Sequence, residues 1–315
     1  MRHVLLFIAT LLAITMEDGG VPAIAGEFPV SALESTVSVL PHRTEMSSDQ
    51  SRLEEPEGSG VAVFDGSYIA TAAHVLIGAE KIYVRLNDGR NLPARIVGRD
   101  AATDVALLHI NTSIPPFVFG DVATVGVPVC SVGNQFGLGL SVTCGVVSAV
   151  HRSNAGFNPI EDFIQTDAAV NPGASGGALI DEAGQLVGMV SGIFTKDSDA
   201  NIGVNFAVHS AMLRRVLDDL KDHGRVRPVT SGMVVQALEL VERETQTGAR
   251  VVRVAPDSAA WRAGLRPDDV IVTIESRKIL HPGDVSGVVY AHRPGDLLPL
   301  EIVRGGQQRR IDLIF

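Results

Sequence analysis

Residues 171–177 have the sequence Asn-Pro-Gly-Ala-Ser-Gly-Gly, in which a serine stands among glycines. Glycines next to a serine leave room for another backbone to approach, and they allow a turn in which the Gly173 and Ser175 amides point at one spot. Paired N–H donors of this kind stabilise the oxyanion of a tetrahedral intermediate. The segment therefore predicts a nucleophilic Ser175 with an oxyanion hole made by Gly173 and Ser175. The alternative is an ordinary Gly-Ser turn.

Two further segments offer the partners that such a serine needs, because serine is a weak nucleophile without a base. Residues 71–74 end an apolar strand and place His74 at its exit; taken alone, a structural histidine is the alternative. Asp104 opens the apolar run at residues 104–108. An aspartate there can hold His74 in the right tautomer and stabilise its imidazolium. His74, Asp104 and Ser175 therefore form a candidate catalytic triad.

The composition indicates a globular protein built from many short strands. With 315 residues the chain is long for one core, so two domains are expected. Hydrophobic residues make up 45%, charged residues 20% and aromatic residues 5%, and there are 32 glycines. The net charge of −10 argues against nucleic acid or an anionic membrane surface as the main partner. No segment resembles a phosphate-binding glycine loop or a metal-ligand cluster, so no cofactor and no metal are expected.

The N-terminus has the pattern of a secretory signal peptide. Arg2 and His3 precede an apolar run at residues 4–16, and Ala23 and Ala25 form a small-x-small site. We expect residues 1–25 to be removed by cleavage after Ala25. The alternative is an uncleaved anchor that tethers the protein to a membrane.

Strand-like runs and turn signals divide the rest of the chain. A first strand is expected at residues 36–40, within an N-terminal segment 26–57 whose residues 41–57 form a polar, mobile loop. Short β-rich runs follow, with hairpin signals at Asp65-Gly66 and Asp88-Gly89. A helix with Ser210 as N-cap and Gly224 as its stop closes the unit at residues 58–224. A linker at residues 225–231 leads to a small domain at residues 232–315.

The two cysteines, Cys130 and Cys144, flank residues 133–139. A hairpin centred near Gly137 would set them opposite each other, within reach of a disulfide. Such a bond suits an exported protein. The alternative is a pair of buried thiols that act as small hydrophobic residues.

Over residues 30–315 the chain resembles the HtrA/Deg family of trypsin-like serine proteases. The segments that carry the resemblance are residues 58–61 (Gly-Ser-Gly-Val), 71–75 (Thr-Ala-Ala-His-Val), 103–106 (Thr-Asp-Val-Ala), 132–134 (Val-Gly-Asn), 136–139 (Phe-Gly-Leu-Gly) and 164–169 (Ile-Gln-Thr-Asp-Ala-Ala), followed by the serine segment. The resemblance implies a mostly β fold, a double β-barrel with the active site between the barrels, followed by a small α+β PDZ domain. It also implies an ATP-independent endopeptidase of the periplasm or cell envelope, which acts in protein quality control and the stress response. The implied partners are unfolded polypeptides or exposed C-termini, and the implied assembly is a homotrimer or a multiple of trimers.

The chain departs from the family pattern at several positions. Ala174 stands where the family usually has Asn, but only the backbone is needed there. Asn205 and His209 replace the usual Gly and Pro near the end of the second barrel. The long loop that some members carry near the first strands is reduced here to about residues 41–57.

The same resemblance makes a prediction about substrate preference. Ala169 stands where enzymes that cleave after Lys or Arg have an aspartate, so a buried cationic side chain would lack its partner. Ile193 falls where enzymes with a broad pocket have glycine. We therefore expect cleavage after Val, Ala or Ile. Ser191 is placed to hydrogen-bond Asp104.

The C-terminal part resembles a PDZ domain through residues 255–260 and 263–271. PDZ domains add a peptide as an extra strand and bind its carboxylate on backbone amides. The resemblance assigns this role to Ser231, Gly232 and Met233, although Ser231 replaces an apolar residue. Arg152 matches a basic residue that reports the ligand state of the PDZ domain to the active site. A solvated surface arginine is the alternative.

Two other functions compete with a quality-control protease. One is a catalytically idle protease fold that serves as a chaperone or peptide-binding protein. The other is a membrane-tethered regulatory protease, which depends on retention of residues 4–16. The intact candidate triad favours an active enzyme.

Overall fold

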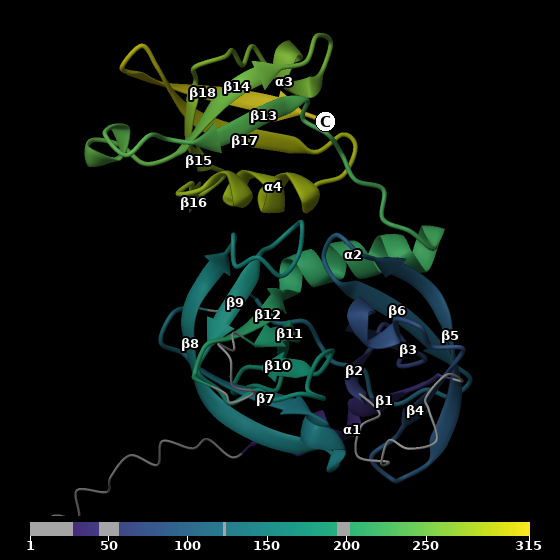
Figure 1. Ribbon diagram of the computed structural model, residues 1–315. Coiled ribbons are helices and arrows are strands. Elements are labelled where there is room, and N and C mark those ends of the chain that lie inside the picture. Colours follow the sequence, from purple (N-terminus) through teal and green to yellow (C-terminus); the bar gives the residue numbers. More distant parts are fainter. Residues whose placement is uncertain (1–27, 44–56, 122–123, 194–201) are drawn as a thin grey trace, which may run out of the picture.

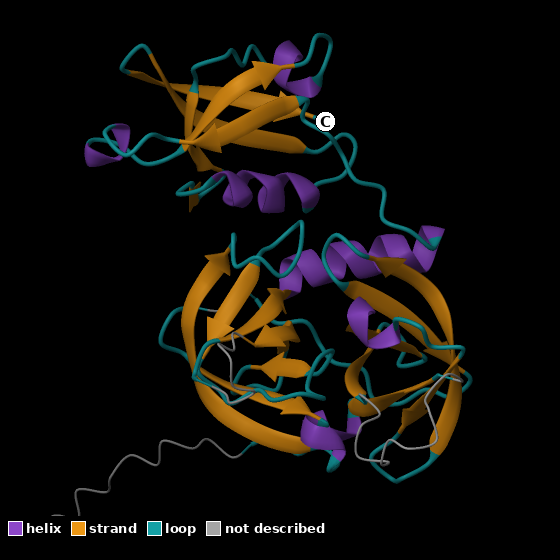
Figure 2. Ribbon diagram, viewed as in Figure 1, coloured by secondary structure: helices purple, strands orange, loops and turns teal. Residues whose placement is uncertain are grey.

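The computed structural model describes residues 28–43, 57–121, 124–193 and 202–315. Within these residues the chain forms two closed β-barrels and a separate sheet (Figure 1). Figure 2 shows that strands dominate all three units. This arrangement confirms the predicted mostly β fold with a trypsin-like double barrel. The predicted signal peptide and most of the polar loop at residues 41–57 lie outside the described residues.

The first barrel follows the short helix α1 (Ser31–Glu34) and closes in the order β1-β2-β3-β6-β5-β4. Both predicted hairpin turns are confirmed: Asp65-Gly66 connects β2 to β3, and Asp88-Gly89 connects β4 to β5. Each of these glycines has a positive φ, 83° at Gly66 and 88° at Gly89, which the turns require. The strands are β1 (Thr36–His42), β2 (Gly58–Val63), β3 (Tyr68–Ala72), β4 (Lys81–Arg85), β5 (Asn91–Asp100) and β6 (Val105–Ile110).

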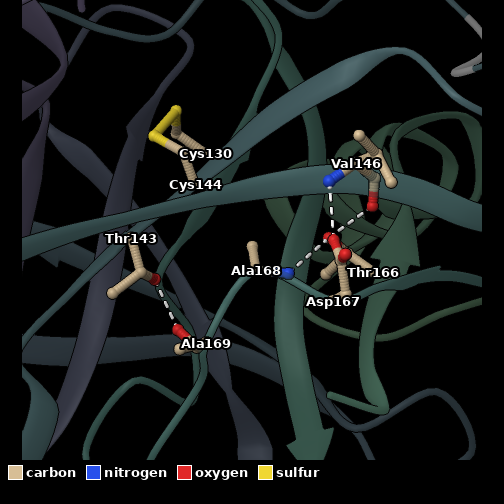
Figure 3. The surroundings of a disulfide bond; sticks show 8 residues. All are labelled: Cys130, Thr143, Cys144, Val146, Thr166, Asp167, Ala168 and Ala169. Carbon is tan, nitrogen blue, oxygen red and sulfur yellow. Dashed lines mark hydrogen bonds between the residues drawn. A yellow bond between two sulfur atoms is a disulfide. The ribbon is translucent and has the colours of Figure 1, made fainter.

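The second barrel repeats this topology in the order β7-β8-β9-β12-β11-β10. Cys130 on the first of these strands pairs with Cys144 on the second, and a disulfide joins them (Figure 3). The hairpin between them carries the 3₁₀ turn η2 (Gln135–Gly137). The strands are β7 (Pro128–Gly133), β8 (Ser141–Arg152), β9 (Phe163–Thr166), β10 (Ala178–Ile180), β11 (Leu186–Ile193) and β12 (Asn205–His209).

Helix α2 (Ser210–His223) begins directly after β12. The prediction that Ser210 is its N-cap was wrong. His209 is the N-cap: it keeps an extended backbone, and its ring Nδ1 accepts a hydrogen bond from Ala211 N at 3.1 Å. Because no residue separates strand and helix, the last strand residue takes the capping position. Gly224 ends the helix as predicted, with φ of 69°.

Helix α2 covers both barrels. It packs against β5 and β6 of the first barrel and against β11 and β12 of the second (Figure 1). Its C-terminal end lies so close to β5 that a Cβ at Gly98 would be 2.5 Å from the Gly224 carbonyl oxygen. Its apolar stripe belongs to one core that spans the two barrels, and the stripe consists of Met212, Leu213, Val216, Leu217 and Leu220.

The third unit is a six-stranded sheet with the path β13-β14-β15-β17-β18, to which β16 is added by pairing with β15. Strand β13 lies at one edge of the sheet, beside α4. No helix within the described ranges is both long and apolar enough to cross a membrane. The elements are β13 (Met233–Ala237), η3 (Glu242–Glu244), β14 (Ala249–Val254), α3 (Ala259–Arg262), β15 (Val270–Ile274), β16 (Arg277–Lys278), α4 (Pro282–Tyr290), β17 (Leu297–Arg304) and β18 (Gln307–Ile314).

Candidate active site

His74 and Asp104 lie side by side at the end of the first barrel. His74 follows β3 in the 3₁₀ turn η1 (Ala73–Leu76), and Asp104 immediately precedes β6. The His74 ring Nδ1 is 2.6 Å from Asp104 Oδ2. The His74 side chain is 46% exposed and that of Asp104 only 12%, so the imidazole faces the solvent from a buried carboxylate. The ring of His74 is therefore anchored through Nδ1, and Nε2 has no hydrogen-bond partner among the described residues.

Asp104 also holds the backbone of the histidine turn. Its Oδ1 accepts a hydrogen bond from His74 N at 2.8 Å, and its carbonyl accepts one from Ala73 N at 2.9 Å. Asp104 itself has a φ of 59°, in the left-handed region that residues other than glycine rarely adopt. Non-glycine residues persist there only when their surroundings fix them. The position of Asp104 therefore depends on the support of the turn that carries it.

The serine segment comes from the second barrel and touches the first through glycines. Gly173 and Gly176 both have positive φ, 94° and 87°. A Cβ at Gly173 would lie 2.3 Å from Asn134 O, and one at Gly176 would lie 2.1 Å from Ser59 O. Ser59 N, on β2 of the first barrel, donates to Ser175 O at 2.8 Å. The glycines that flank Ser175 are thus required by close packing as well as by the turn.

The two amides predicted to form the oxyanion hole are the unsatisfied ones. Ala174 N donates to Asn171 O at 3.0 Å, whereas Gly173 N and Ser175 N have no hydrogen-bond acceptor within the described part of the chain. Ser175 Oγ hydrogen-bonds to Ser191 O at 3.5 Å, and no hydrogen bond joins it to His74 among the described residues. Hydrogen bonds of this kind are often long without substrate and tighten when it binds.

Sequence reasoning missed the role of Ser59. Its hydroxyl donates to Gly173 O at 2.7 Å and accepts from Asn134 N at 2.8 Å, so one side chain of the first barrel holds two loops of the second. The only signal in the sequence was its place in the Gly-Ser-Gly-Val segment at residues 58–61. Ser191 was predicted to reach Asp104, and its Oγ is 3.4 Å from Asp104 Oδ2.

The two residues predicted to shape the specificity pocket, Ala169 and Ile193, both belong to the second barrel and its loops. Ala169 is partly buried, and its carbonyl accepts a hydrogen bond from Thr143 on β8 (Figure 3). Ile193 ends β11 and pairs with Asn205, whose amide donates to Ala168 O at 2.8 Å. The segment before Ser175 is therefore held by side chains from β8 and β12, the two strands that flank β9.

Arg152 lies at the end of β8, next to a cluster of charges. Its Nε donates to Gln165 Oε1 at 3.1 Å. In this cluster, Asp162 accepts hydrogen bonds from His151 and from Arg277 of the C-terminal unit. Burial would raise the pKa of Asp162, but these two partners outweigh burial and lower it. Burial lowers the pKa of the neighbouring His209. Within the described residues, no group of three or more His, Cys, Asp or Glu is placed to hold a metal ion.

The segment predicted to bind a peptide carboxylate is already hydrogen-bonded in this structure. Gly232 has a φ of 75°, and its N donates to Thr230 Oγ1 at 3.3 Å. Met233 N donates to Ser231 Oγ at 3.3 Å. A carboxylate at these amides would have to replace the side-chain acceptors. The adjacent β13 is an edge strand, which a peptide can extend.

Comparisons with known proteins find matching domain families and relatives. The family described as trypsin-like peptidase domain matches residues 58–189, and the PDZ domain family matches residues 200–314. The chain is 38% identical over 264 residues to a probable periplasmic serine endoprotease DegP-like of Marinomonas sp. (strain MWYL1), and 36% identical over 266 residues to the periplasmic serine endoprotease DegP of Escherichia coli (strain K12). Both alignments cover 81% of this chain and 56% of the relative, so the chain spans about half the length of these curated relatives.

Solved structures match nearly the whole chain. The HtrA-type protease AlgW with tripeptide superimposes with a TM-score of 0.70 at 34% identity, over 90% of this chain and 95% of that one. The serine endoprotease from Yersinia pestis gives a TM-score of 0.56 at 29% identity, over 90% of this chain and 96% of that one.

Proposed function

Because this chain belongs to the HtrA/Deg family of trypsin-like serine proteases with a C-terminal PDZ domain, we propose that it is an ATP-independent serine endopeptidase that uses His74, Asp104 and Ser175. The observation that carries the proposal is the 2.6 Å contact between His74 Nδ1 and Asp104 Oδ2. Ser191 connects this pair to Ser175, because its Oγ is 3.4 Å from Asp104 Oδ2 and its carbonyl accepts from Ser175 Oγ at 3.5 Å. The periplasmic relatives support a location in the periplasm or cell envelope.

The geometry supports acyl transfer by the usual serine-protease sequence. Ser175 Oγ attacks the carbonyl carbon of the scissile bond while His74 Nε2 takes its proton. Asp104, bonded to His74 Nδ1, stabilises the imidazolium, and the Gly173 and Ser175 amides stabilise the oxyanion. His74 then gives the proton to the leaving amine. A water molecule then attacks the acyl group while His74 takes its proton, and Ser175 Oγ leaves and receives that proton. This sequence of steps uses neither ATP nor a metal.

The pocket favours small or medium aliphatic side chains before the cut. Ala169 offers no carboxylate to pair with a buried Lys or Arg, and an unpaired buried charge is costly. Unfolded or selected exported polypeptides are the proposed substrates. The proposed assembly is a homotrimer or a multiple of trimers.

The C-terminal domain is proposed to bind peptide C-termini along β13 and to recruit substrate or regulate the protease. The exposed edge of the sheet supports this mode of binding. Arg152 is the proposed reporter, since it lies at the end of β8, beside Arg277 of the C-terminal domain.

A fluorophosphonate probe tests the proposed function directly. We expect covalent labelling at Ser175, located by mass spectrometry, and loss of labelling in His74→Ala because the base is then absent. If the purified protein resists labelling even with denatured substrate and a hydrophobic C-terminal peptide present, the chain is an idle protease fold that binds peptides. The N-terminal sequence of the same preparation shows whether residues 4–16 are retained as a tether.

A further inference from the structure

Helix α4 lies on the side of the C-terminal domain that faces the barrels (Figure 1), and its C-terminal end contacts their core. Its last residue, Tyr290, is 9% exposed and belongs to the core cluster that spans both barrels and α2. Gly287 on the same helix approaches the loop before β9 so closely that a Cβ would lie 2.7 Å from Glu161 O. The C-terminal domain thus places one aromatic side chain inside the protease unit.

The Tyr290 hydroxyl ends on the turn that carries Asp104. It donates to Asp100 Oδ1 at 2.9 Å, although the two residues are 190 positions apart in the chain. The other oxygen, Asp100 Oδ2, accepts from Thr103 Oγ1 at 2.6 Å and from Thr103 N at 3.2 Å. Thr103 directly precedes Asp104. One buried carboxylate therefore links Tyr290 to the residue next to Asp104.

The Tyr290 hydroxyl is suited to donate a hydrogen bond at any pH at which the enzyme works. Burial and the Asp100 carboxylate raise the pKa of Tyr290 above its usual value, so the phenol stays protonated over the working range of an enzyme. Hydrogen bonds to a charged group in a buried site are about twice as strong as neutral ones. Asp100 is itself 9% exposed, so water competes little for its oxygens.

The same turn has a second support that also touches α4. Ala102 O accepts from Ile160 N at 2.9 Å, and Thr103 O accepts from Asn158 Nδ2 at 3.3 Å. The loop with these donors is held by Glu161, whose carboxylate accepts backbone hydrogen bonds from Ala155, Phe157 and Asn158. Because Gly287 packs on Glu161, helix α4 reaches the Asp104 turn by two routes.

We propose that Tyr290 is a positioning residue for the proposed triad. Its hydroxyl, through Asp100 and Thr103, holds Asp104 in the left-handed conformation that aligns His74. The inference rests on the proposed function of His74, Asp104 and Ser175. It gives the C-terminal domain a part in the catalytic geometry itself, separate from any role in binding peptides.

The test is Tyr290→Phe, which removes one oxygen and keeps the ring in the core. We expect kcat for an aliphatic peptide substrate to fall about three- to tenfold, with KM unchanged, as for the loss of one hydrogen bond. The pH dependence of kcat/KM should also differ from that of the parent protein, because Asp104 then stabilises the charged His74 imidazolium less well. Asp100→Asn should give a similar change, and the double variant should be no worse than Asp100→Asn alone.

The matched control is Arg293→Ala. Arg293 Nη2 is 2.8 Å from Asp218 Oδ2 on α2, so this variant also loosens the contact between the domains but leaves the Asp100 turn untouched. We expect its kcat and pH profile to match the parent protein. Equal losses in Tyr290→Phe and Arg293→Ala would mean that only docking matters and would overturn the inference. So would an unchanged kcat and pH profile in Tyr290→Phe.

A readout without turnover separates this inference from the proposed function. A proton held between His74 Nδ1 and Asp104 should give a far-downfield NMR resonance, since the two atoms are 2.6 Å apart. We expect this resonance to shift upfield or broaden in Tyr290→Phe and to stay in place in Arg293→Ala. If the parent protein is inactive toward the fluorophosphonate probe, the proposed function fails while this resonance still tests the role of Tyr290. An unmoved resonance in Tyr290→Phe contradicts that role.

Discussion

The two barrels have the same strand order but hold their parts of the site by different means. In the first barrel, His74 and Asp104 are joined by side-chain hydrogen bonds, the shortest at 2.6 Å. In the second, the Ser175 segment is formed by backbone that packs closely, and Gly173 and Gly176 are where a Cβ would clash. We therefore expect the half proposed to transfer the proton to be sensitive to loss of a side chain, and the half proposed to bind the oxyanion to be sensitive to addition of one.

The largest expected effect on cleavage comes from variants that change one proposed catalytic side chain in each half of the site. Ser175→Ala should lower cleavage of casein on the order of 10⁶-fold, and Asp104→Asn about 10⁴-fold, with the fold intact. Because the two act as a unit, the double variant should be no slower than Ser175→Ala. Ser191→Ala is the matched control, since it removes only a 3.4 Å contact to Asp104 and should cost little. Unchanged proteolysis by Ser175→Ala in a preparation free of contaminants would refute the assignment.

A second prediction concerns only the Ser175 segment of the second barrel. Gly173→Ala should lower kcat about 10²–10³-fold, as when one oxyanion donor is lost, because its Cβ would meet Asn134 O at 2.3 Å. Gly139→Ala is the control: Gly139 has a similar φ of 99° with nothing within 4 Å of its Cβ position. Equal losses in the two variants would show that backbone strain, and not the oxyanion geometry, explains the effect.

The specificity pocket proposed for the second barrel leads to a third prediction. Cleavage after Val, Ala or Ile should exceed cleavage after Lys or Arg by about 100-fold or more, because Ala169 leaves a buried cation unpaired. Cleavage after Phe should also be slower, given Ile193. Mass spectrometry of the fragments from an unfolded protein gives the cut sites directly. A majority of cuts after basic residues would contradict the pocket assignment.

The smallest expected effect is on control of the second barrel by the C-terminal domain. Hydrophobic C-terminal peptides should activate cleavage about 5–150-fold, the range of a typical coupling free energy. Arg152→Ala should keep peptide binding but lose this activation, whereas Arg95→Ala, an exposed arginine on β5, should keep both. If peptides bind without any change in the activity of the parent protein, the domain only recruits substrate.

Local patterns predicted much of the fold. The turns at Asp65-Gly66 and Asp88-Gly89 depend on short-range backbone chemistry, and Gly224 ends α2 because a left-handed residue is needed there. The hairpin that sets Cys130 opposite Cys144 also follows from spacing. The N-cap of α2 was missed because β12 runs into the helix without a connecting residue, which places His209 in the capping position.

Of the supports of the candidate site, only the contact of Ser191 with Asp104 was predicted, and it came from the family resemblance. The others join residues far apart in sequence, and no local pattern indicates them. Ser59 holds Gly173 across the two barrels, and Tyr290 reaches Asp100 from the last helix of the chain. Ser59 stands in the Gly-Ser-Gly-Val segment, but that segment does not show which loops its hydroxyl holds, and Tyr290 stands in no motif. The triad residues themselves were recognisable because each stands at a strand end or in a glycine turn, and their catalytic roles stay predictions.

Helix α2 has a consequence for how the chain folds as it is made. The strands of the first barrel are complete in sequence at Ile110, but the helix that covers β5 and β6 begins only at Ser210. Until that helix emerges, the apolar surface under Val216, Leu217 and Leu220 stays open to water. Contacts over such separations form slowly, and exposed apolar surface promotes aggregation in the meantime. A nascent chain halted before residue 210 is therefore a natural client for a chaperone.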